Sequence, residues 1–380
     1  MSPRLLLSLL AFGSGSLAPA RDQVALLGTY TGNAATDSRG IYAVKLDGET
    51  GALSAPELVA ELSNPEFLAL HPNGHILYAL TQVKTPEGKN TGAVTAFALD
   101  PATLKLTPLN TESTGRGQLC HIAVDATGRQ VIVTAYGDPY VASFPIAADG
   151  RIGKVASVIT HTGPLGPKSD RQNTAHAHSF TVSPDNRLAF AADLGLDRVF
   201  TYRLDPEHGR LAPHDPAFTA MPPGAGPRHT KFSPDGKHFY ILSELVGTVT
   251  ACRYDAARGV MTPFQTLSTL PTDYLGRPSA SEIRVHPSGR FVYAANRIHD
   301  SLAVFARDAD TGALTLVEHV PTGGDQPRNF NLTPDGAWLL CANQGTDNLI
   351  VFKVDAATGR LASTGRTTKV PKCVCVLFLP

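Results

Sequence analysis

A short turn motif recurs along the chain at nearly even spacing, and this repeat limits the folds that the sequence can adopt. Six copies of a pattern typified by Ser-Pro-Asp-Gly begin at positions 71, 125, 183, 233, 286 and 333, at intervals of 54, 58, 50, 53 and 47 residues. Self-similarity at a period of about fifty residues is the signature of a repeat architecture. The 380 residues are therefore expected to form an array of similar units.

Each repeat has the sequence pattern of β-strands. Apolar or β-branched runs flank the turn, as in "HPSGRFVYAANR" at 286–297, and a further run such as "SLAVFARD" at 301–308 follows. No long segment shows helical periodicity. Four strands per repeat of this length are typical of a β-propeller blade.

The two ends of the chain together supply one more blade. "PKCVCVLFLP" at 371–380 matches "PRNFNLTPDG" at 327–336 as a first strand, while "QVALLGTYTG" at 23–32 and "GIYAVKLD" at 40–47 match second and third strands. Pairing of these segments would close the ring and remove the exposed edge of an open array. We therefore predict an all-β fold, a seven-bladed β-propeller closed by pairing of the C-terminal strand with the N-terminal strands, as a single domain over residues 21–380.

The first twenty residues differ from the repeats. Arg4 precedes an apolar stretch, and the small-residue sequence "APA" occupies 18–20, which is the pattern of a secretory signal peptide. The stretch is too short and too glycine-rich for a membrane-spanning helix. We predict a signal peptide over 1–20 and export to the periplasm or beyond, with no membrane insertion after its removal. A cytoplasmic protein with an unstructured start is the alternative.

Composition and motifs exclude several classes of function. The 33 basic and 33 acidic side chains balance, so nothing favours a nucleic-acid partner. The five cysteines have no metal-ligand spacing and are expected to be buried thiols. The Gly-x-Ser-x-Gly elbow of serine hydrolases and the Gly-x-Gly-x-x-Gly loop of dinucleotide-binding proteins are absent. We expect neither a metal nor a cofactor, and the sequence leaves the oligomeric state open.

The ionisable residues of the repeats are expected to gather at one mouth of the central channel. The first and second strands of a blade form a hairpin, so the start of the first and the end of the second lie at the same end of the blade. Strand starts supply Glu66, His121, His176, His178, Arg228, His229, Glu282, Arg328, Asn329 and Lys372. Strand ends supply Thr29, Tyr30, Gln82, Asp138, Asp193, Glu244, Asn296, Arg297, Asn343 and Gln344.

A few of these residues indicate chemistry, although a single polar residue at a strand end is more often solvated or structural. Arg228, Glu244 and Arg297 would bring two cations and an acid together, which suits an anionic substrate and acid/base catalysis. The planar guanidinium group suits a carboxylate or a phosphate. His178 lies two residues after His176 and so on the same strand face.

Several longer motifs, taken in order, resemble one family. They are "GTYT" (28–31), "AHAHSFTVSPDNRLAFAADLGLDRVFTY" (175–202), "GPRHTKFSPDGKHFYILSEL" (226–245), "HPSGRFVYAANRIHDSLAVF" (286–305) and "QPRNFNLTPDGAWLLCANQGTDNLIVF" (326–352). The chain from about 24 to 380 resembles the lactonase family of seven-bladed propellers, which includes propeller-type 6-phosphogluconolactonases and the carboxy-cis,cis-muconate lactonizing enzyme. The resemblance implies metal-independent lactone chemistry. It also implies a site with a histidine, two arginines and a glutamate, matched here by His178, Arg228, Arg297 and Glu244.

The expected function is hydrolysis of a small anionic sugar lactone, 6-phosphoglucono-1,5-lactone or a close relative. Glu244 or His178 would be the general base, and the pKa of Glu244 would have to be raised by partial burial. Arg228 and Arg297 would hold the anionic group and stabilise the developing oxyanion. The remaining substrate-binding residues would be His176, His229, Arg328, Asn343, Gln344 and Asp193. The alternatives are a cyclising enzyme acting on an unsaturated dicarboxylate, and an exported, non-catalytic propeller that binds a ligand or a protein.

Overall fold

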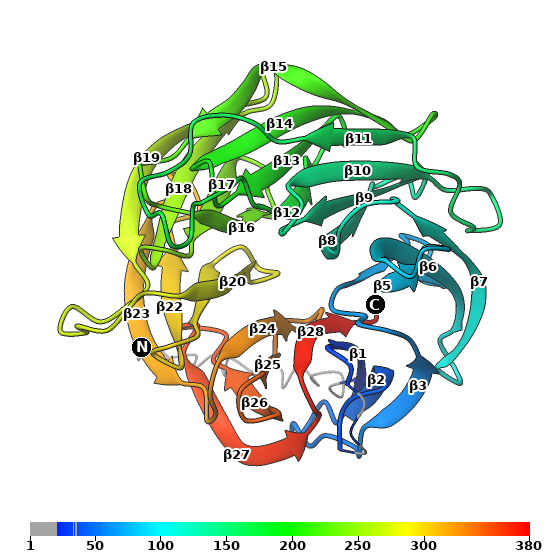
Figure 1. Cartoon of the computed structure of the whole chain (residues 1–380). Helices are drawn as coiled ribbons and strands as arrows, with labels where there is room; N and C mark the ends of the chain where they lie inside the picture. Colours follow the sequence, from blue (N-terminus) through cyan, green and yellow to red (C-terminus); the bar gives the residue numbers. More distant parts are fainter. Residues whose placement is uncertain (1–20, 33, 35) are drawn as a thin grey trace, which may run out of the picture.

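The computed structural model describes residues 21–32, 34 and 36–380 and has the predicted all-β architecture. The described residues contain 28 strands, arranged in seven four-stranded sheets, and no helix, membrane-crossing or otherwise. Figure 1 shows the sheets as blades around a central axis. The predicted seven-bladed β-propeller is therefore confirmed. The predicted signal peptide, residues 1–20, lies outside the described residues.

We number the blades 1 to 7 around the ring and give their strands from the innermost outward. Blades 1 to 3 consist of β28 (Cys373–Phe378), β1 (Gln23–Thr29), β2 (Gly40–Leu46) and β3 (Glu57–Glu61); of β4 (Leu68–Leu70), β5 (Ile76–Lys84), β6 (Asn90–Asp100) and β7 (Lys105–Ser113); and of β8 (Leu119–Val124), β9 (Gln130–Ala135), β10 (Tyr140–Pro145) and β11 (Ser157–Thr160). Blades 4 and 5 consist of β12 (Ala177–Val182), β13 (Leu188–Asp193), β14 (Arg198–Asp205) and β15 (Arg210–Ala220); and of β16 (Pro227–Phe232), β17 (His238–Ser243), β18 (Thr248–Asp255) and β19 (Val260–Ser268). Blades 6 and 7 consist of β20 (Ala280–Val285), β21 (Phe291–Asn296), β22 (Ser301–Arg307) and β23 (Leu314–Pro321); and of β24 (Pro327–Leu332), β25 (Trp338–Asn343), β26 (Asn348–Val354) and β27 (Leu361–Lys369).

The repeated turn joins the first and second strands of a blade. In blade 5 the Ser233 hydroxyl accepts a hydrogen bond from the backbone of His238 at 3.0 Å, and the Asp235 carboxylate accepts one from the backbone of Lys237 at 3.0 Å. Gly236 has φ +69°, a conformation that glycine adopts without steric cost. The motif is therefore explained by turn geometry at the end of the hairpin away from the candidate site.

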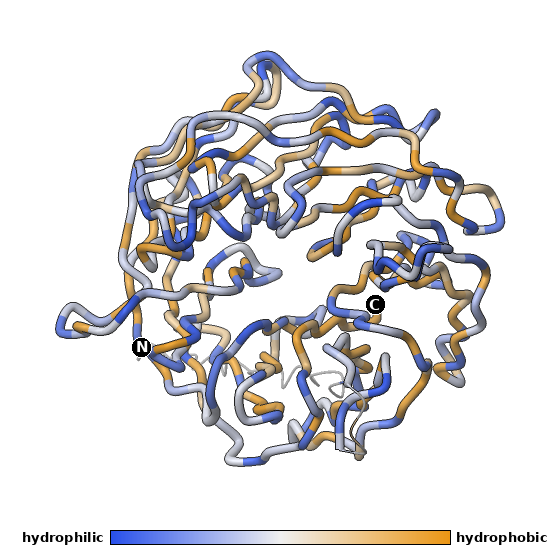
Figure 2. Tube along the Cα trace, viewed as in Figure 1, coloured by the Kyte–Doolittle hydropathy of each residue, from blue (hydrophilic) through white to orange (hydrophobic). Residues whose placement is uncertain are grey.

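Neighbouring blades pack through apolar faces and a recurring buried tyrosine. Figure 2 shows the apolar residues concentrated along the strands and the hydrophilic ones at the turns. The hydroxyl groups of Tyr78, Tyr240 and Tyr293, each on the second strand of its blade, donate to the carbonyl groups of Gly150, Gly312 and Gly359 at 2.9–3.0 Å. Each glycine lies in the following blade, so this bond repeats between blades. The hydroxyl of a buried tyrosine is thereby satisfied.

The ring is closed in blade 1 by the two ends of the chain, as predicted. β28 pairs antiparallel with β1, with Leu27 opposite Val376 and Ala25 opposite Phe378. Val376 and Phe378 are buried in a cluster with the side chains of blades 1 and 7. The inner strand of blade 1 is therefore held both by sheet hydrogen bonds and by apolar packing.

We expect the closure to be sensitive to the loss of a single side chain. Phe378→Ala removes a buried ring from β28, and its expected cost is about 3 kcal/mol of unfolding free energy. The measurement is denaturant unfolding of the full chain. Phe218→Ala is the matched control, because Phe218 lies on the outer strand β15 and is 37% exposed, so its expected cost is under about 1 kcal/mol. Equal losses in the two variants would contradict the prediction.

Candidate active site

A pocket of about 400 Å³ opens at one mouth of the channel and is lined from all seven blades. Its position follows from the topology, because the starts of the inner strands, the ends of the second strands and the loops between blades all meet there. The lining residues are Tyr30, Glu66, Gln118, Leu119, Cys120, Tyr136, Gly137, Arg171, His178, Glu244, Arg297 and Arg328. Of the ten residues predicted for the site, four line this pocket: His178, Glu244, Arg297 and Arg328.

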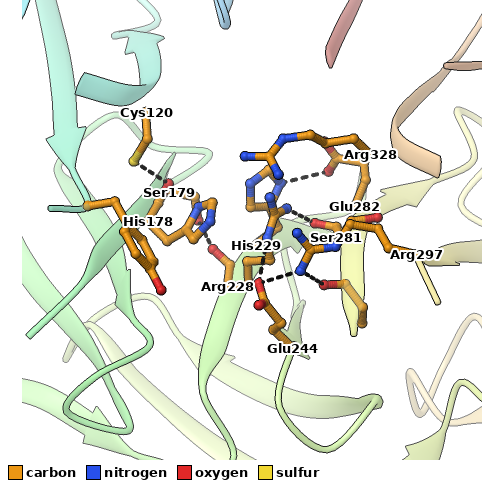
Figure 3. A network of polar contacts seen from close by, with 12 residues as sticks. Cys120, His178, Ser179, Arg228, His229, Glu244, Ser281, Glu282, Arg297 and Arg328 are labelled. Atoms are coloured by element: carbon orange, nitrogen blue, oxygen red, sulfur yellow. Dashed lines mark hydrogen bonds and ion pairs between the residues drawn. The ribbon is translucent and has the colours of Figure 1, made fainter. Parts of the chain in front are cut away.

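Glu244 follows β17 directly and is the centre of a charge cluster. Its carboxylate lies 2.5 Å from Nη2 of Arg171, 3.0 Å from Nε of Arg228 and 2.9 Å from Nη2 of Arg297. Figure 3 shows Arg228 and Arg297 directed toward it. The Glu244 side chain is 2% exposed. One carboxylate therefore neutralises only part of the charge of three guanidinium groups.

The pKa of Glu244 overturns one expectation. Burial alone would raise this pKa, but the charges of Arg297, Arg228 and Arg171 outweigh it and lower the pKa to about 2. The prediction that Glu244 has the raised pKa of a general base is therefore wrong. At neutral pH this carboxylate is fully ionised and serves as a counter-ion that fixes the arginines.

The three arginines differ in how far they reach the pocket. Their side chains are 3% exposed for Arg228, 15% for Arg297 and 26% for Arg171. Arg228 is not among the lining residues; its Nη1 donates to the carbonyl oxygen of Ser281 beneath the pocket. Burial lowers the pKa of Arg228 to about 9. Arg297 and Arg171 are therefore the cations that can contact a ligand, and Arg228 supports them through Glu244.

His178 lies on β12 and faces the pocket as an uncharged ring. Burial, with the nearby charge of Arg228, lowers its pKa well below 6.5. Its Nδ1 has no hydrogen-bond partner among the described residues. The ring meets those of Tyr136 and His229 edge to face, at centroid distances of 5.4 and 5.3 Å. At neutral pH this imidazole is therefore in its unprotonated form.

His176 and His229 support the site rather than line it. Nδ1 of His176 donates to the carbonyl oxygen of Tyr136 at 2.9 Å, and the two rings stack at 4.1 Å. Nδ1 of His229 lies 3.0 Å from the carboxylate of Glu282, which is fully buried. Neither side chain is among the lining residues, and both contact residues of the pocket wall, Tyr136 and His178.

Asp193, Asn343 and Gln344 are not among the lining residues, contrary to expectation. Oδ1 of Asp193 accepts from the backbone of His176 at 2.9 Å, and its Oδ2 lies 2.7 Å from Nδ1 of His161. Nδ2 of Asn343 donates to the carbonyl oxygen of Thr322 at 3.2 Å. Asp193 and Asn343 end their strands, whereas Glu244 and Arg297 each follow a strand by one residue. Because side chains alternate, this shift by one residue turns the side chain into the neighbouring loop. Gln344 also follows its strand by one residue, so its absence from the lining has no explanation in strand position.

Six of the twelve lining residues were not predicted for the mouth: Gln118, Leu119, Cys120, Tyr136, Gly137 and Arg171. Arg171 belongs to the loop that joins β11 to β12, and such loops between blades reach the same mouth. The length of that loop was the available signal. In blade 3 we expected Asp138, but Asp138 pairs with Arg116 at 2.5 Å, and Tyr136 lines the pocket instead.

The side of the pocket formed by blades 7, 1 and 2 has a different character. Nη2 of Arg328 donates to the Tyr30 hydroxyl at 2.9 Å, and Nε2 of Gln118 donates to Oε1 of Glu66 at 2.5 Å. Cys120 also lines the pocket, but burial raises the pKa of its thiol to about 12, so it is not a thiolate nucleophile. The described residues contain no cluster of three or more potential metal ligands.

Comparison with known proteins places this chain in one family. Residues 24–378 match the family described as lactonase, 7-bladed beta-propeller. The 6-phosphogluconolactonase of Bacillus subtilis strain 168 is 38% identical over 356 residues, which cover 94% of this chain and 98% of the relative. A relative of the same name from Formosa agariphila is 32% identical over 297 residues, covering 77% and 81%.

Solved structures lead to the same family. The structure of the Pseudomonas aeruginosa periplasmic gluconolactonase has a TM-score of 0.88 at 33% identity and covers 95% of this chain and 99% of that one. A protein from Lactobacillus plantarum has a TM-score of 0.86 at 33% identity, with 95% and 100% covered. The sequence motifs, the closed ring and these relatives agree: the chain belongs to the lactonase family of seven-bladed β-propellers.

Proposed function

We propose that this chain is an enzyme that hydrolyses a sugar lactone, with 6-phosphoglucono-1,5-lactone or a close relative as substrate. The observation that carries the proposal is that one pocket combines an uncharged His178, whose Nδ1 has no hydrogen-bond partner in the described part of the chain, with an excess of arginine charge. A lactone needs an activated water and a stabilised oxyanion, and these groups supply both. The relatives named 6-phosphogluconolactonase support this class of substrate.

His178 is the general base in this mechanism. It takes a proton from water as the water oxygen attacks the lactone carbonyl carbon, and Arg297 stabilises the negative charge that develops on the carbonyl oxygen. Glu244 keeps its charge throughout and holds Arg297 and Arg171 in place. The mechanism uses only groups of the chain and no metal ion.

Arg171 is proposed to bind the anionic group of the substrate. It is the most exposed of the three arginines that contact Glu244, at 26%, and its guanidinium group has donors left for a phosphate or carboxylate. Arg328, on the far side of the pocket, adds a further cation. A net positive pocket of this size suits a small sugar anion.

We also propose that the protein is exported. The signal-peptide pattern of residues 1–20 supports this location, as does the similarity to a periplasmic gluconolactonase. An exported enzyme would meet unphosphorylated sugar lactones more often than phosphorylated ones, so both substrates must be compared.

The proposal is tested by initial rates on freshly prepared 6-phosphogluconolactone and gluconolactone, corrected for spontaneous hydrolysis, with the chain lacking residues 1–20. We expect turnover on at least one lactone. His178→Asn should lower kcat by about 10²-fold or more, because the base is lost. In the wild type the acid-side fall of kcat should lie below pH 6.5, where His178 becomes protonated. No turnover above background on either lactone would contradict the function.

Arg171→Ala should reveal whether phosphate matters. Loss of a charge-assisted contact worth about 1.5–3 kcal/mol predicts a rise in KM of roughly 10- to 100-fold for the phosphorylated lactone, with little change for gluconolactone. Arg171→Lys is the matched control; it keeps the charge without the planar fork and should fall between. Equal effects on the two substrates would contradict a role in binding phosphate.

Glu244→Gln should destabilise the protein in a pH-dependent way. It leaves buried arginines without a counter-ion, at an expected cost of about 3 kcal/mol near neutral pH. Because the folded-state pKa is lowered from 4.5 to about 2, the carboxylate stabilises the fold above pH 4.5. That stabilisation is lost as the pH falls through 2. Denaturant unfolding at several pH values should therefore show the gap to wild type narrowing in acid.

The matched control for that measurement is Glu57→Gln, at an exposed position on β3. Its unfolding free energy should stay within about 0.5 kcal/mol of wild type at neutral pH. A gap for Glu244→Gln that stays constant from neutral pH down to pH 2 would contradict the assigned role of the carboxylate.

A further inference from the structure

Hydrolysis of a lactone ends with a step that the residues assigned above do not assist. When the ring carbon–oxygen bond breaks, the electron pair goes to the ring oxygen, which leaves as a strongly basic alkoxide unless it receives a proton. In the first step His178 takes a proton from the attacking water. Until it loses that proton, it faces the side from which the water attacked. A separate proton donor on the leaving-group side would therefore accelerate the reaction.

Among the carboxyl groups that line the pocket, one is a candidate for this donor. Arg171, Arg297 and Arg328 cannot give up a proton at ordinary pH. Burial raises the pKa of the Tyr30 hydroxyl above its ordinary value and that of the Cys120 thiol to about 12. Among the described lining residues, two carry carboxyl groups, and the carboxylate of Glu244 is held in the ionised form by its arginines.

The remaining carboxyl group, that of Glu66, has different surroundings. Glu66 lies two residues before the start of β4 and is 7% exposed. It forms no ion pair with the described part of the chain. Its Oε1 accepts from Gln118 at 2.5 Å. The next residue, Phe67, packs against the ring of His121 at 4.2 Å, which holds this segment at the mouth.

The position of Glu66 in the ring suits a donor. It belongs to blade 2, whereas Glu244 belongs to blade 5 on the other side of the seven-membered ring, so the two carboxyl groups approach a ligand from opposite sides. His178, in blade 4, lies between them along the ring. A lactone whose anionic group contacts Arg171 and Arg297 can therefore present its ring oxygen toward blades 1 and 2.

We propose that Glu66 is a catalytic residue of the proposed lactonase, the general acid that protonates the departing ring oxygen. The inference rests on the proposed function. In the first step the water oxygen bonds to the carbonyl carbon, the carbonyl electron pair moves to its oxygen, and His178 takes the water proton. In the second step the carbonyl reforms, the ring carbon–oxygen bond breaks, and the proton of Glu66 goes to the ring oxygen. Water then returns the proton of His178 to the Glu66 carboxylate.

The surroundings of Glu66 act on its pKa in opposite directions. Burial raises its pKa; the hydrogen-bond donors Gln118 and Tyr30 and the charge of Arg328 oppose this rise, and the Cys120 thiol lies nearby. The acid form is the active one, so activity should fall on the alkaline side as Glu66 ionises. Removing a donor that stabilises the carboxylate should move that fall to higher pH.

The test is the pH dependence of kcat on the better of the two lactones, with wild type, Glu66→Gln and Gln118→Met. The kcat of the wild type should fall at acid pH and again at alkaline pH. Glu66→Gln should lower kcat by about 10²-fold, change KM by less than about threefold, and lose the alkaline fall while the acid fall stays. Gln118→Met removes the amide that donates to the Glu66 carboxylate, so it should shift the alkaline fall of kcat to higher pH.

The outcomes separate this inference from the proposed function. If wild type turns over lactone and Glu66→Gln keeps both kcat and the alkaline fall, Glu66 is not the acid and the proposed function stands. If Glu66→Gln does not fold, Gln118→Met decides the question. An alkaline fall of kcat at the same pH as in the wild type then overturns the inference, and the proposed function still stands. If wild type hydrolyses neither lactone, the proposed function fails and the role of Glu66 fails with it.

Discussion

Pairing of β28 with β1 closes the ring, and the mouth that holds the candidate site depends on this closure. Blade 1 is assembled from both ends of the chain, and Tyr30 directly follows its strand β1. Tyr30 stands between Glu66 of blade 2 and Arg328 of blade 7, and it accepts a hydrogen bond from Arg328. In an open array blades 2 and 7 would be the two free edges. The closure that protects the sheet edges therefore also completes the pocket.

The charges around Glu244 do not balance, and this distinguishes the cluster from a simple buried ion pair. Removing ions from water costs several kcal/mol each, and buried pairs regain this only with close contacts. Glu244 makes such contacts with three arginines, at 2.5–3.0 Å. One carboxylate neutralises the charge of only one of the three guanidinium groups. The remaining positive charge can bind an anionic ligand. The same excess of charge contributes to keeping His178 unprotonated.

The sequence was sufficient to predict the fold because the turn motif repeats with the period of a blade and the two ends complete the last one. Hairpin topology also predicted which mouth holds Glu66, His178, Glu244, Arg297 and Arg328. It could not separate a residue that ends a strand from the one that follows it. A boundary error of one residue reverses the direction of the side chain. Arg171 was missed for another reason: the length of its loop could indicate that the loop reaches the mouth, but the path of a loop follows no periodic pattern that would single out one residue.

Glu66 and Glu244 show why residue type and location do not determine acid/base chemistry. Both are buried glutamates at the same mouth, and burial raises the pKa of a carboxyl group in either place. The arginines that contact Glu244 reverse this effect, whereas Glu66 is held by the neutral Gln118 side chain and keeps its raised pKa. A carboxylate close enough to arginines to position them for an anion cannot exchange protons near neutral pH. In the proposed lactonase, holding the arginines and protonating the leaving group therefore belong to two different carboxyl groups, set apart across the mouth.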